Sequence, residues 1–126
     1  MKLSIDKHEK YIILKLEEEK LESLIAPNLK SELIYITTEG YRNIILDLAD
    51  VKYVDSSGLS AILTGNRLCK AANGSFILAN VQPTVKKLIE ISQLETILTV
   101  LQNVEEAVDY VFIEEIERDL RHSDED

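Results

Sequence analysis

The sequence of 126 residues is poor in the residue types that build disulfide-rich, metal-binding and fibrous proteins. Cys69 is its only cysteine, so an intramolecular disulfide and a cysteine-based metal site are both excluded. The two histidines, His8 and His122, lie near the two ends of the chain, in an expected turn and an expected tail, and neither is placed to be catalytic or to bind a metal. With only four glycines and two prolines, and 45% hydrophobic residues, the composition is that of an ordinary globular domain. We expect no cofactor and no metal.

Long apolar runs and basic residues are also scarce. No apolar run approaches the roughly 18 residues that a membrane span needs, and the first six residues contain no apolar signal core. We therefore expect a cytoplasmic protein that does not insert into a membrane. The 14 basic residues are outnumbered by 23 acidic ones, and this net charge of −9 argues against nucleic acid or an anionic membrane as a partner.

The negative charge is concentrated at the C-terminal end. Residues 104–126 contain ten acidic and two basic residues, whereas the first 103 residues are nearly balanced, with 13 and 12. The apolar spacing from Val104 to about Leu120 predicts an amphipathic helix that docks on the domain and includes Phe112 and Ile116, and we expect the chain to fray from Arg118. This divides the sequence into a domain, 1–117, and an acidic tail, 118–126. The tail either keeps the protein soluble, as charge runs usually do, or contacts a basic partner surface.

Strand-like and helix-like segments alternate along the chain. Strands are expected at residues 3–7, 11–16, 43–48, 51–54, 75–79 and 97–101, and the first two can form a hairpin through residues 8–10. Residues 17–22 form a charged connection. The first helix is expected from about Ser23 to Gly40, with Pro27 in its first turn, and its apolar residues fall mostly on one face: Leu24, Ile25, Leu29, Leu33, Ile34 and Ile36. Two more helices precede the last one, so we expect an α/β fold with a mixed four- to six-stranded sheet and about four helices.

The segment from Val54 to Leu59, Val-Asp-Ser-Ser-Gly-Leu, lies where a strand is expected to give way to a helix. The first N–H groups of a helix have no internal partner and the helix dipole is positive there, so this place tolerates a negative group such as phosphate. Asp55 or Ser56 can cap the helix, and a simple capping turn is the alternative interpretation. Ser56 is not placed as a hydrolase nucleophile, because the Gly-x-Ser-x-Gly pattern and a suitable histidine are missing. No acid–base pair or metal cluster emerges either, and we predict that the protein is not an enzyme.

Residues 51–63, with Asp-Ser-Ser-Gly-Leu at their centre, resemble the signature of the STAS superfamily, whose soluble bacterial members are the anti-sigma factor antagonists. Residues 44–48 resemble the strand before that signature. Residues 76–88 resemble the later strand, the short loop with proline and the next helix of the family, and Leu94 with the apolar residues after it resembles the segment before its last helix. The resemblance covers roughly residues 1–112 and implies a single STAS-like domain.

The resemblance also implies a function. In the family, the first serine of the motif, here Ser56, is phosphorylated by a partner kinase that is also an anti-sigma factor. The unphosphorylated antagonist binds this serine kinase and frees the sigma factor; phosphorylation breaks the complex, and a phosphatase restores the unphosphorylated form. The choice of Ser56 over Ser57 rests on the family alignment.

Five residues are expected to contact the partner: Asp55, Ser57, Gly58, Leu59 and Glu22. Asp55 is interpreted as both capping the helix and orienting Ser56, and Gly58 as allowing close approach of a partner backbone. Glu22 stands near the acid of a Gly-x-Leu-Asp-x-x-Thr-Ala stretch of the family, but the glycine and threonine of that stretch are absent from residues 18–27. The partner specificity is therefore open.

Some residues near or outside the motif receive plainer interpretations. Tyr53 is predicted to pack in the core, with an interface aromatic as the alternative, and Cys69 is predicted to be a small buried apolar residue. Lys86 and Lys87 are expected on a solvated helix face. An alternative function is a soluble STAS accessory or ligand-binding subunit of another complex, such as a lipid or anion transport system. A pulldown that recovers a histidine-kinase-like ATPase favours the first function, and one that recovers a transporter ATPase favours the second.

Overall fold

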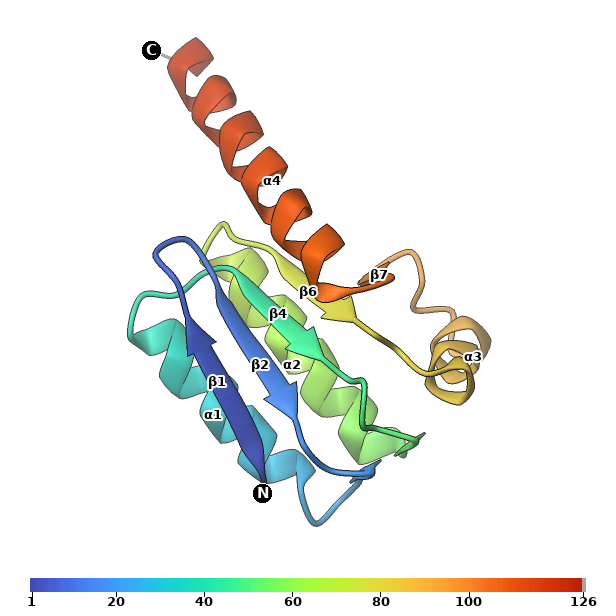
Figure 1. Ribbon diagram of the computed structural model, residues 1–126. Coiled ribbons are helices and arrows are strands. Elements are labelled where there is room, and N and C mark those ends of the chain that lie inside the picture. Colours follow the sequence, from blue (N-terminus) through green and yellow to red (C-terminus); the bar gives the residue numbers. More distant parts are fainter. Residues whose placement is uncertain (126) are drawn as a thin grey trace.

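The computed structural model describes residues 1–125, and its centre is a five-stranded sheet (Figure 1). The strands are β1 (Leu3–Lys7), β2 (Ile12–Leu16), β4 (Ile44–Asp47), β6 (Phe76–Ala79) and β7 (Thr99–Leu101), which lie side by side in this order. β1 pairs with β2 in antiparallel fashion, and the other pairs are parallel. A separate parallel pair, β3 (Lys20–Leu21) with β5 (Tyr53–Val54), carries the residues that lead into the predicted motif.

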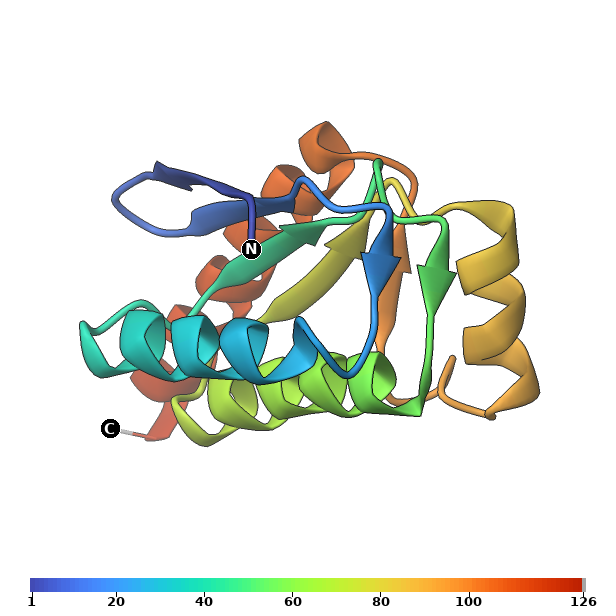
Figure 2. The ribbon, with the colours of Figure 1, turned by 90° about the horizontal axis from the view of Figure 1, so that it is seen from below.

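Four helices surround the sheet. α1 (Ala26–Thr38) and α2 (Ser56–Ala71) lie side by side on one face, and α4 (Val104–Glu125) packs on the other (Figure 2). α3 (Pro83–Ile91) lies at one end, next to β5. The predicted α/β class, with a mixed sheet and four helices, is confirmed.

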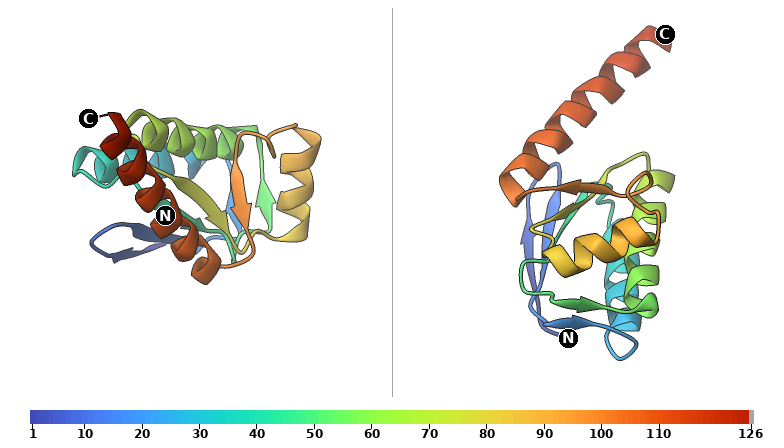
Figure 3. Two further views of the ribbon diagram at one scale, coloured as in Figure 1. Left: turned by 90° about the horizontal axis from the view of Figure 1, so that it is seen from above. Right: turned by 90° about the vertical axis from the view of Figure 1, so that its right-hand side faces the viewer.

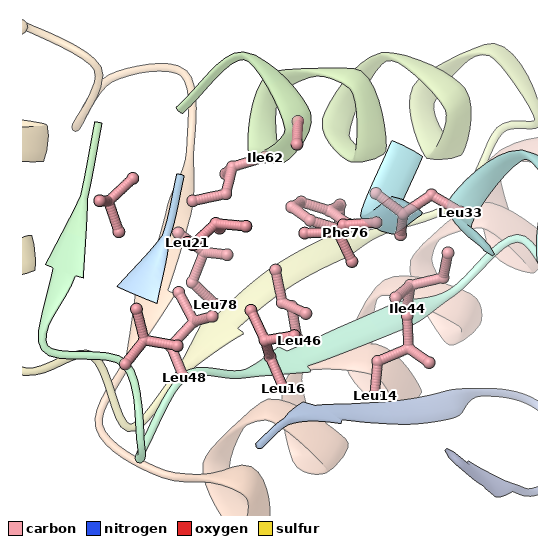
Figure 4. Close-up of a cluster of buried hydrophobic side chains, with 14 of the residues drawn as sticks. Leu14, Leu16, Leu21, Leu33, Ile44, Leu46, Leu48, Ile62, Phe76 and Leu78 are labelled. Carbon is pink, nitrogen blue, oxygen red and sulfur yellow. The ribbon is translucent and has the colours of Figure 1, made fainter. Parts of the chain in front are cut away.

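The continuous apolar run in β4 is explained by helices on both faces of the sheet. Ile44 and Leu46 point into the larger core, beneath α1 and α2, where they meet residues of α1, α2, β2 and β6 (Figure 4). Ile45, between them, belongs to a smaller core with Ala107 and Val111 of α4. Side chains alternate across a strand, so a strand covered on both faces needs apolar residues at every position.

The N-terminal hairpin forms as expected. Leu3 pairs with Leu16 and Lys7 with Ile12, and the backbone N–H of His8 donates to the carbonyl oxygen of Tyr11 at 2.9 Å to close the turn. In β2 buried and half-buried positions alternate, which is typical of a strand with one well-covered face.

The first helix starts later than predicted. α1 begins at Ala26 rather than near Ser23, because the carbonyl oxygen of Glu22 accepts hydrogen bonds from Ile25 and Ala26 and closes a turn over residues 23–25. Leu24 lies in this turn with 82% of its surface exposed, so its predicted place on the buried helix face is wrong. Ile34 is also half exposed. The charged connection before the turn contains the short strand β3, which the sequence did not indicate.

The last helix starts at Val104 as predicted, but its second half differs from the prediction. Ala107 and Val111 are buried against the sheet, whereas Phe112, Ile116 and Leu120 are exposed, because their spacing places them on the other side of the helix. The end of α4 also extends beyond the edge of the sheet (Figures 1 and 3). Helical structure continues to Glu125, so residue 118 is not the start of a frayed segment. Asp126, the last residue of the predicted acidic tail, lies outside the described residues.

Candidate functional site

The site begins where β5 ends and α2 starts. Asp55 is the N-cap residue of α2: it has an extended backbone, and its Oδ1 accepts a hydrogen bond from the backbone N–H of Gly58 at 2.8 Å. Its carbonyl oxygen accepts the first helical hydrogen bond, from Leu59. Ser56 is thus the first residue of the helix, at the end where backbone N–H groups and the dipole are positive.

Asp55 also binds a second segment of the chain. Its Oδ2 accepts a hydrogen bond from the backbone N–H of Ser23 at 3.2 Å, and its own backbone N–H donates to Leu21. The carboxylate therefore joins the start of α2 to the turn between β3 and α1. The predicted capping role of Asp55 is observed, and the link to Ser23 adds a role that spacing alone does not reveal.

Gly58 is required by packing inside the chain. It is buried, and a Cβ at this position would lie 2.2 Å from the carbonyl oxygen of Leu21 and 2.9 Å from the side chain of Val54. The close approach expected at Gly58 is thus made by this chain's own β3. Because Gly58 is buried within its own chain, it would affect partner binding through the shape that it gives to the Asp55–Ser56 loop.

Ser56 and Ser57 line a surface cavity of about 300 Å³. Ser56 is exposed and Ser57 partly so. The other lining residues come from the turn before α1, from the first turns of α1 and from α2: Ser23, Ala26, Pro27, Lys30 and Ser60. Phosphate on Ser56 would have this hydroxyl-rich space beside it.

Lys30 is the only charged residue that lines this cavity. It forms no ion pair or hydrogen bond with any other residue in the part of the chain that the structure describes. Asp55, next to Ser56 in the chain, uses its two carboxylate oxygens on backbone N–H groups. A new anion on Ser56 would therefore have a capping carboxylate beside it in the chain and an unpaired ammonium group in the wall of the same cavity.

Two large apolar residues stand exposed beside the motif. Tyr53 is 51% exposed on β5, because the alternation of this short strand turns Val54 into the core and Tyr53 outward. The prediction that Tyr53 packs in the core is wrong, and its alternative interpretation as an interface aromatic stays open. Leu24, next to Ser23 in the sequence, is the second exposed residue.

The structure brings most of the predicted residues together. Asp55, Ser56 and Ser57 meet at the loop, and Glu22 adjoins it because β3 pairs with β5. Leu59 is only partly accessible and packs against the larger core. Ser23, Lys30 and Ser60 also line the cavity, although none of them was predicted. Ser60 could have been predicted from its four-residue step from Ser56 along one helix face, whereas the positions of the other two depend on how α1 packs against α2.

Other candidate chemistry is limited. Within residues 1–125, no group of three or more His, Cys, Asp or Glu side chains is arranged to hold a metal ion, and no helix is long and apolar enough to cross a membrane. Burial raises the pKa of Cys69 to about 12, so this thiol stays protonated at neutral pH and behaves as the predicted small buried apolar residue. Lys86 and Lys87 are exposed on α3, as predicted.

Comparison with known proteins agrees with this geometry. The family model described as the STAS domain matches residues 2–107. The chain belongs to the STAS domain family. A relative from Bordetella bronchiseptica, BtrV, named as a candidate anti-sigma factor antagonist, is 31% identical over 107 residues, which cover 85% of this chain and 91% of the relative.

Solved structures share the fold of this STAS protein. The crystal structure of TM1081 from Thermotoga maritima, titled as a candidate anti-sigma factor antagonist, aligns with a TM-score of 0.79 at 23% identity, over 86% of this chain and 93% of that one. The anti-sigma factor antagonist SpoIIAA aligns in its unphosphorylated form with a TM-score of 0.69 at 21% identity, over 87% and 97% of the two chains. Its phosphorylated form, from Bacillus, aligns with a TM-score of 0.68 at 23% identity, over 87% and 99%.

Proposed function

We propose that this STAS protein is an anti-sigma factor antagonist controlled by phosphorylation of Ser56. Unphosphorylated, it binds an anti-sigma factor serine kinase; phosphorylated on Ser56, it releases that kinase, and a phosphatase resets it. The observation that carries the proposal is the placement of Ser56: exposed, first in α2, directly after a capping aspartate and beside an open cavity. The names of the relatives and of SpoIIAA, which is known in both phosphorylation states, support it.

The partner surface of the proposal surrounds this serine. Asp55, Ser57, Leu59 and Glu22 lie at or next to the loop, and exposed Leu24 and Tyr53 offer apolar contact area beside it. Large apolar and aromatic side chains next to a polar centre are typical anchors of protein interfaces. Gly58 contributes by allowing the loop to lie against β3.

Phosphorylation would act on this surface through charge and solvation. The phosphate adds about −1.5 to −2 charges at neutral pH to a loop that already contains Asp55. An interface complementary to a neutral hydroxyl would have to desolvate a dianion and accommodate its volume. A loss of about 3 kcal/mol in binding free energy lowers affinity more than a hundredfold, which is enough to exchange partners.

The first experiment tests the phosphoacceptor. The protein is incubated with the candidate kinase encoded in the same genome, ATP and Mg²⁺, and intact and peptide masses are measured. We expect a single phosphate on the wild type and on Ser57→Ala, the matched control, and none on Ser56→Ala. An unmodified wild type, or full phosphorylation of Ser56→Ala, would overturn the assignment.

The second experiment tests the switch. Protein with phosphoserine at position 56 and unmodified protein are titrated with the same kinase, and the two affinities are compared by calorimetry. We expect the phosphorylated form to bind at least a hundredfold more weakly. Equal affinities would leave Ser56 as a kinase substrate without a switching role.

A further inference from the structure

A stripe of large apolar side chains is exposed on α4 between residues 112 and 120, and its first member, Phe112, has a ring partner, Tyr11. Phe112, Ile113, Ile116 and Leu120 have 45%, 56%, 59% and 61% of their surface accessible. Their three- and four-residue steps place them on one side of the helix, and we call them the α4 stripe. The opposite side of α4 holds Ala107, Val111 and Glu115, which are buried against the sheet and its edge.

Acidic residues border the α4 stripe on both sides. Asp109, Glu117 and Asp119 are all exposed, and each lies three or four residues from a member of the stripe. Arg118 of this helix is turned toward the domain: it donates to Ser75 Oγ at 2.6 Å and lies 3.6 Å from Glu115 Oε1. The Nε of Arg121 donates to the backbone carbonyl oxygen of Glu117, one turn earlier. The exposed side of the helix therefore combines apolar centres with negative edges.

The place of the stripe in the fold makes it accessible. The C-terminal turns of α4 extend beyond the sheet, whereas its first turns cross the sheet (Figure 3). Glu115 is bound to Arg42 and Asn43, just before β4 begins, while Ser56 follows β5 on the other side of the sheet. A partner on the stripe would thus occupy a surface different from the Ser56 loop.

We propose that the α4 stripe is a docking surface for a second protein partner whose groove is apolar in its centre and bordered by lysine and arginine. The charge pattern selects this occupant, since like charges along the rim of an interface disfavour association and opposite charges favour it. A second copy of this chain would set Asp109, Glu117 and Asp119 against the same residues. An anionic membrane would repel the same acidic border.

The experiment uses synthetic peptides as probes of this chemistry. The first is an 18-residue amphipathic helix with a leucine stripe flanked by lysines; the second has the same leucines flanked by glutamates; the third keeps the lysines but replaces leucine with serine. Each carries a fluorophore and is titrated with the full chain at low and at 300 mM salt, and anisotropy is recorded. We expect the first peptide to bind at least tenfold more tightly than the other two, and more weakly at high salt.

Variants of the chain locate the binding. We expect Ile116→Gln with Leu120→Gln, and separately Asp109→Asn with Glu117→Gln, to weaken binding of the first peptide at least fivefold. The matched controls, Ile34→Gln with Ile91→Gln and Glu90→Gln with Glu95→Gln, change equally exposed residues elsewhere by the same chemistry and should leave binding unchanged. Ser56→Ala should also bind as the wild type does, so the result does not depend on the proposed phosphorylation.

Three results would overturn the proposal. The first is that the stripe variants and their controls weaken binding of the first peptide equally. The peptide would then be attracted only to the net charge of the chain. The second is equal binding of the glutamate-flanked peptide. The third is a dimer of the wild-type chain in sedimentation experiments that dissociates in the variant Ile116→Gln with Leu120→Gln. That result would mean that a second copy of the chain binds the stripe. Circular dichroism of each variant checks that α4 is intact.

Discussion

At the scale of single residues, the placement of Lys30 near Ser56 predicts how a phosphate on Ser56 would titrate. They line one cavity from two different helices, and Lys30 is the only cation in its wall. A nearby positive charge favours the doubly ionised form of a phosphate and therefore lowers its second pKa, which is ordinarily about 6. We expect Lys30→Gln to raise this second pKa of phosphoserine installed at position 56, followed by ³¹P NMR, because the variant and the wild type share the Asp55 carboxylate and differ only in the cation.

The control for this titration is Lys70→Gln. Lys70 lies 14 residues after Ser56 in the same helix, roughly 21 Å away, and beyond the Debye length of about 8 Å at physiological salt. It should leave the phosphate pKa unchanged. Identical titration curves for the wild type and Lys30→Gln would mean that the phosphate points away from the cavity.

The same residues show how far sequence reasoning reaches. The capping role of Asp55 and the position of Ser56 at the start of a helix follow from a local pattern, because capping involves neighbours within three residues. Lys30 and Ser23 are 26 and 33 residues from Ser56, and their contribution depends on the packing of α1 against α2 and on the pairing of β3 with β5. Local patterns contain no information about such distant contacts.

At the scale of elements, the start of α2 depends on the carboxylate of Asp55. Asp55→Ala removes hydrogen bonds to Gly58 and Ser23 and frees two backbone N–H groups. We expect it to lower the free energy of unfolding by about 1–2 kcal/mol, the usual effect of losing a cap. Asp55→Asn keeps an acceptor oxygen for Gly58 and should cost less. Urea unfolding followed by circular dichroism measures both, and equal stability of Asp55→Ala and wild type would contradict the capping role.

Element boundaries were the weaker part of the sequence prediction, for two physical reasons. β3 has two residues, too few for an alternation to be visible, and it exists because Leu21 pairs with Val54. In α4, apolar residues continue past Val111 on the other side of the helix, and periodicity alone cannot show which apolar side the sheet covers. Phe112, Ile116 and Leu120 were therefore expected to be buried, and the structure exposes them.

At the scale of the whole molecule, α4 is attached to the domain by a polar cluster as well as by apolar contacts. Glu115 is buried and accepts hydrogen bonds from Arg42 Nη2 at 2.7 Å and from Asn43 Nδ2 at 2.5 Å. Asn43 Oδ1 in turn accepts from the backbone N–H of Ser75, whose hydroxyl is bound by Arg118. The cluster joins the starts of two central strands to a helix that is 72 residues away in sequence for Asn43 and 43 for Ser75, so it stabilises the arrangement of layers.

The pH dependence of folding should report on this cluster. Burial alone would raise the pKa of Glu115, but the hydrogen bonds from Arg42 and Asn43 and the charges of Arg42 and Arg118 outweigh burial, and the pKa is lowered. A carboxyl whose pKa is lower in the folded state stabilises the fold above its unfolded pKa, ordinarily about 4.3, and loses this contribution as pH falls through the folded value.

Glu115→Gln removes the charge that Arg42 and Arg118 face, and we expect it to lower the free energy of unfolding by about 2–3 kcal/mol at pH 7. This loss is less than for a fully buried pair because Arg42 is partly exposed. Urea unfolding at pH 7 and at pH 3 should show this difference shrinking at the lower pH, because below its ordinary pKa the carboxyl of the unfolded chain takes up a proton that the folded chain binds less readily. Glu117→Gln, an exposed neighbour in the same helix, should change stability by no more than about 0.5 kcal/mol at either pH. A difference between Glu115→Gln and the wild type that stays constant from pH 7 to pH 3 would mean that shape, and not charge, holds α4 in place.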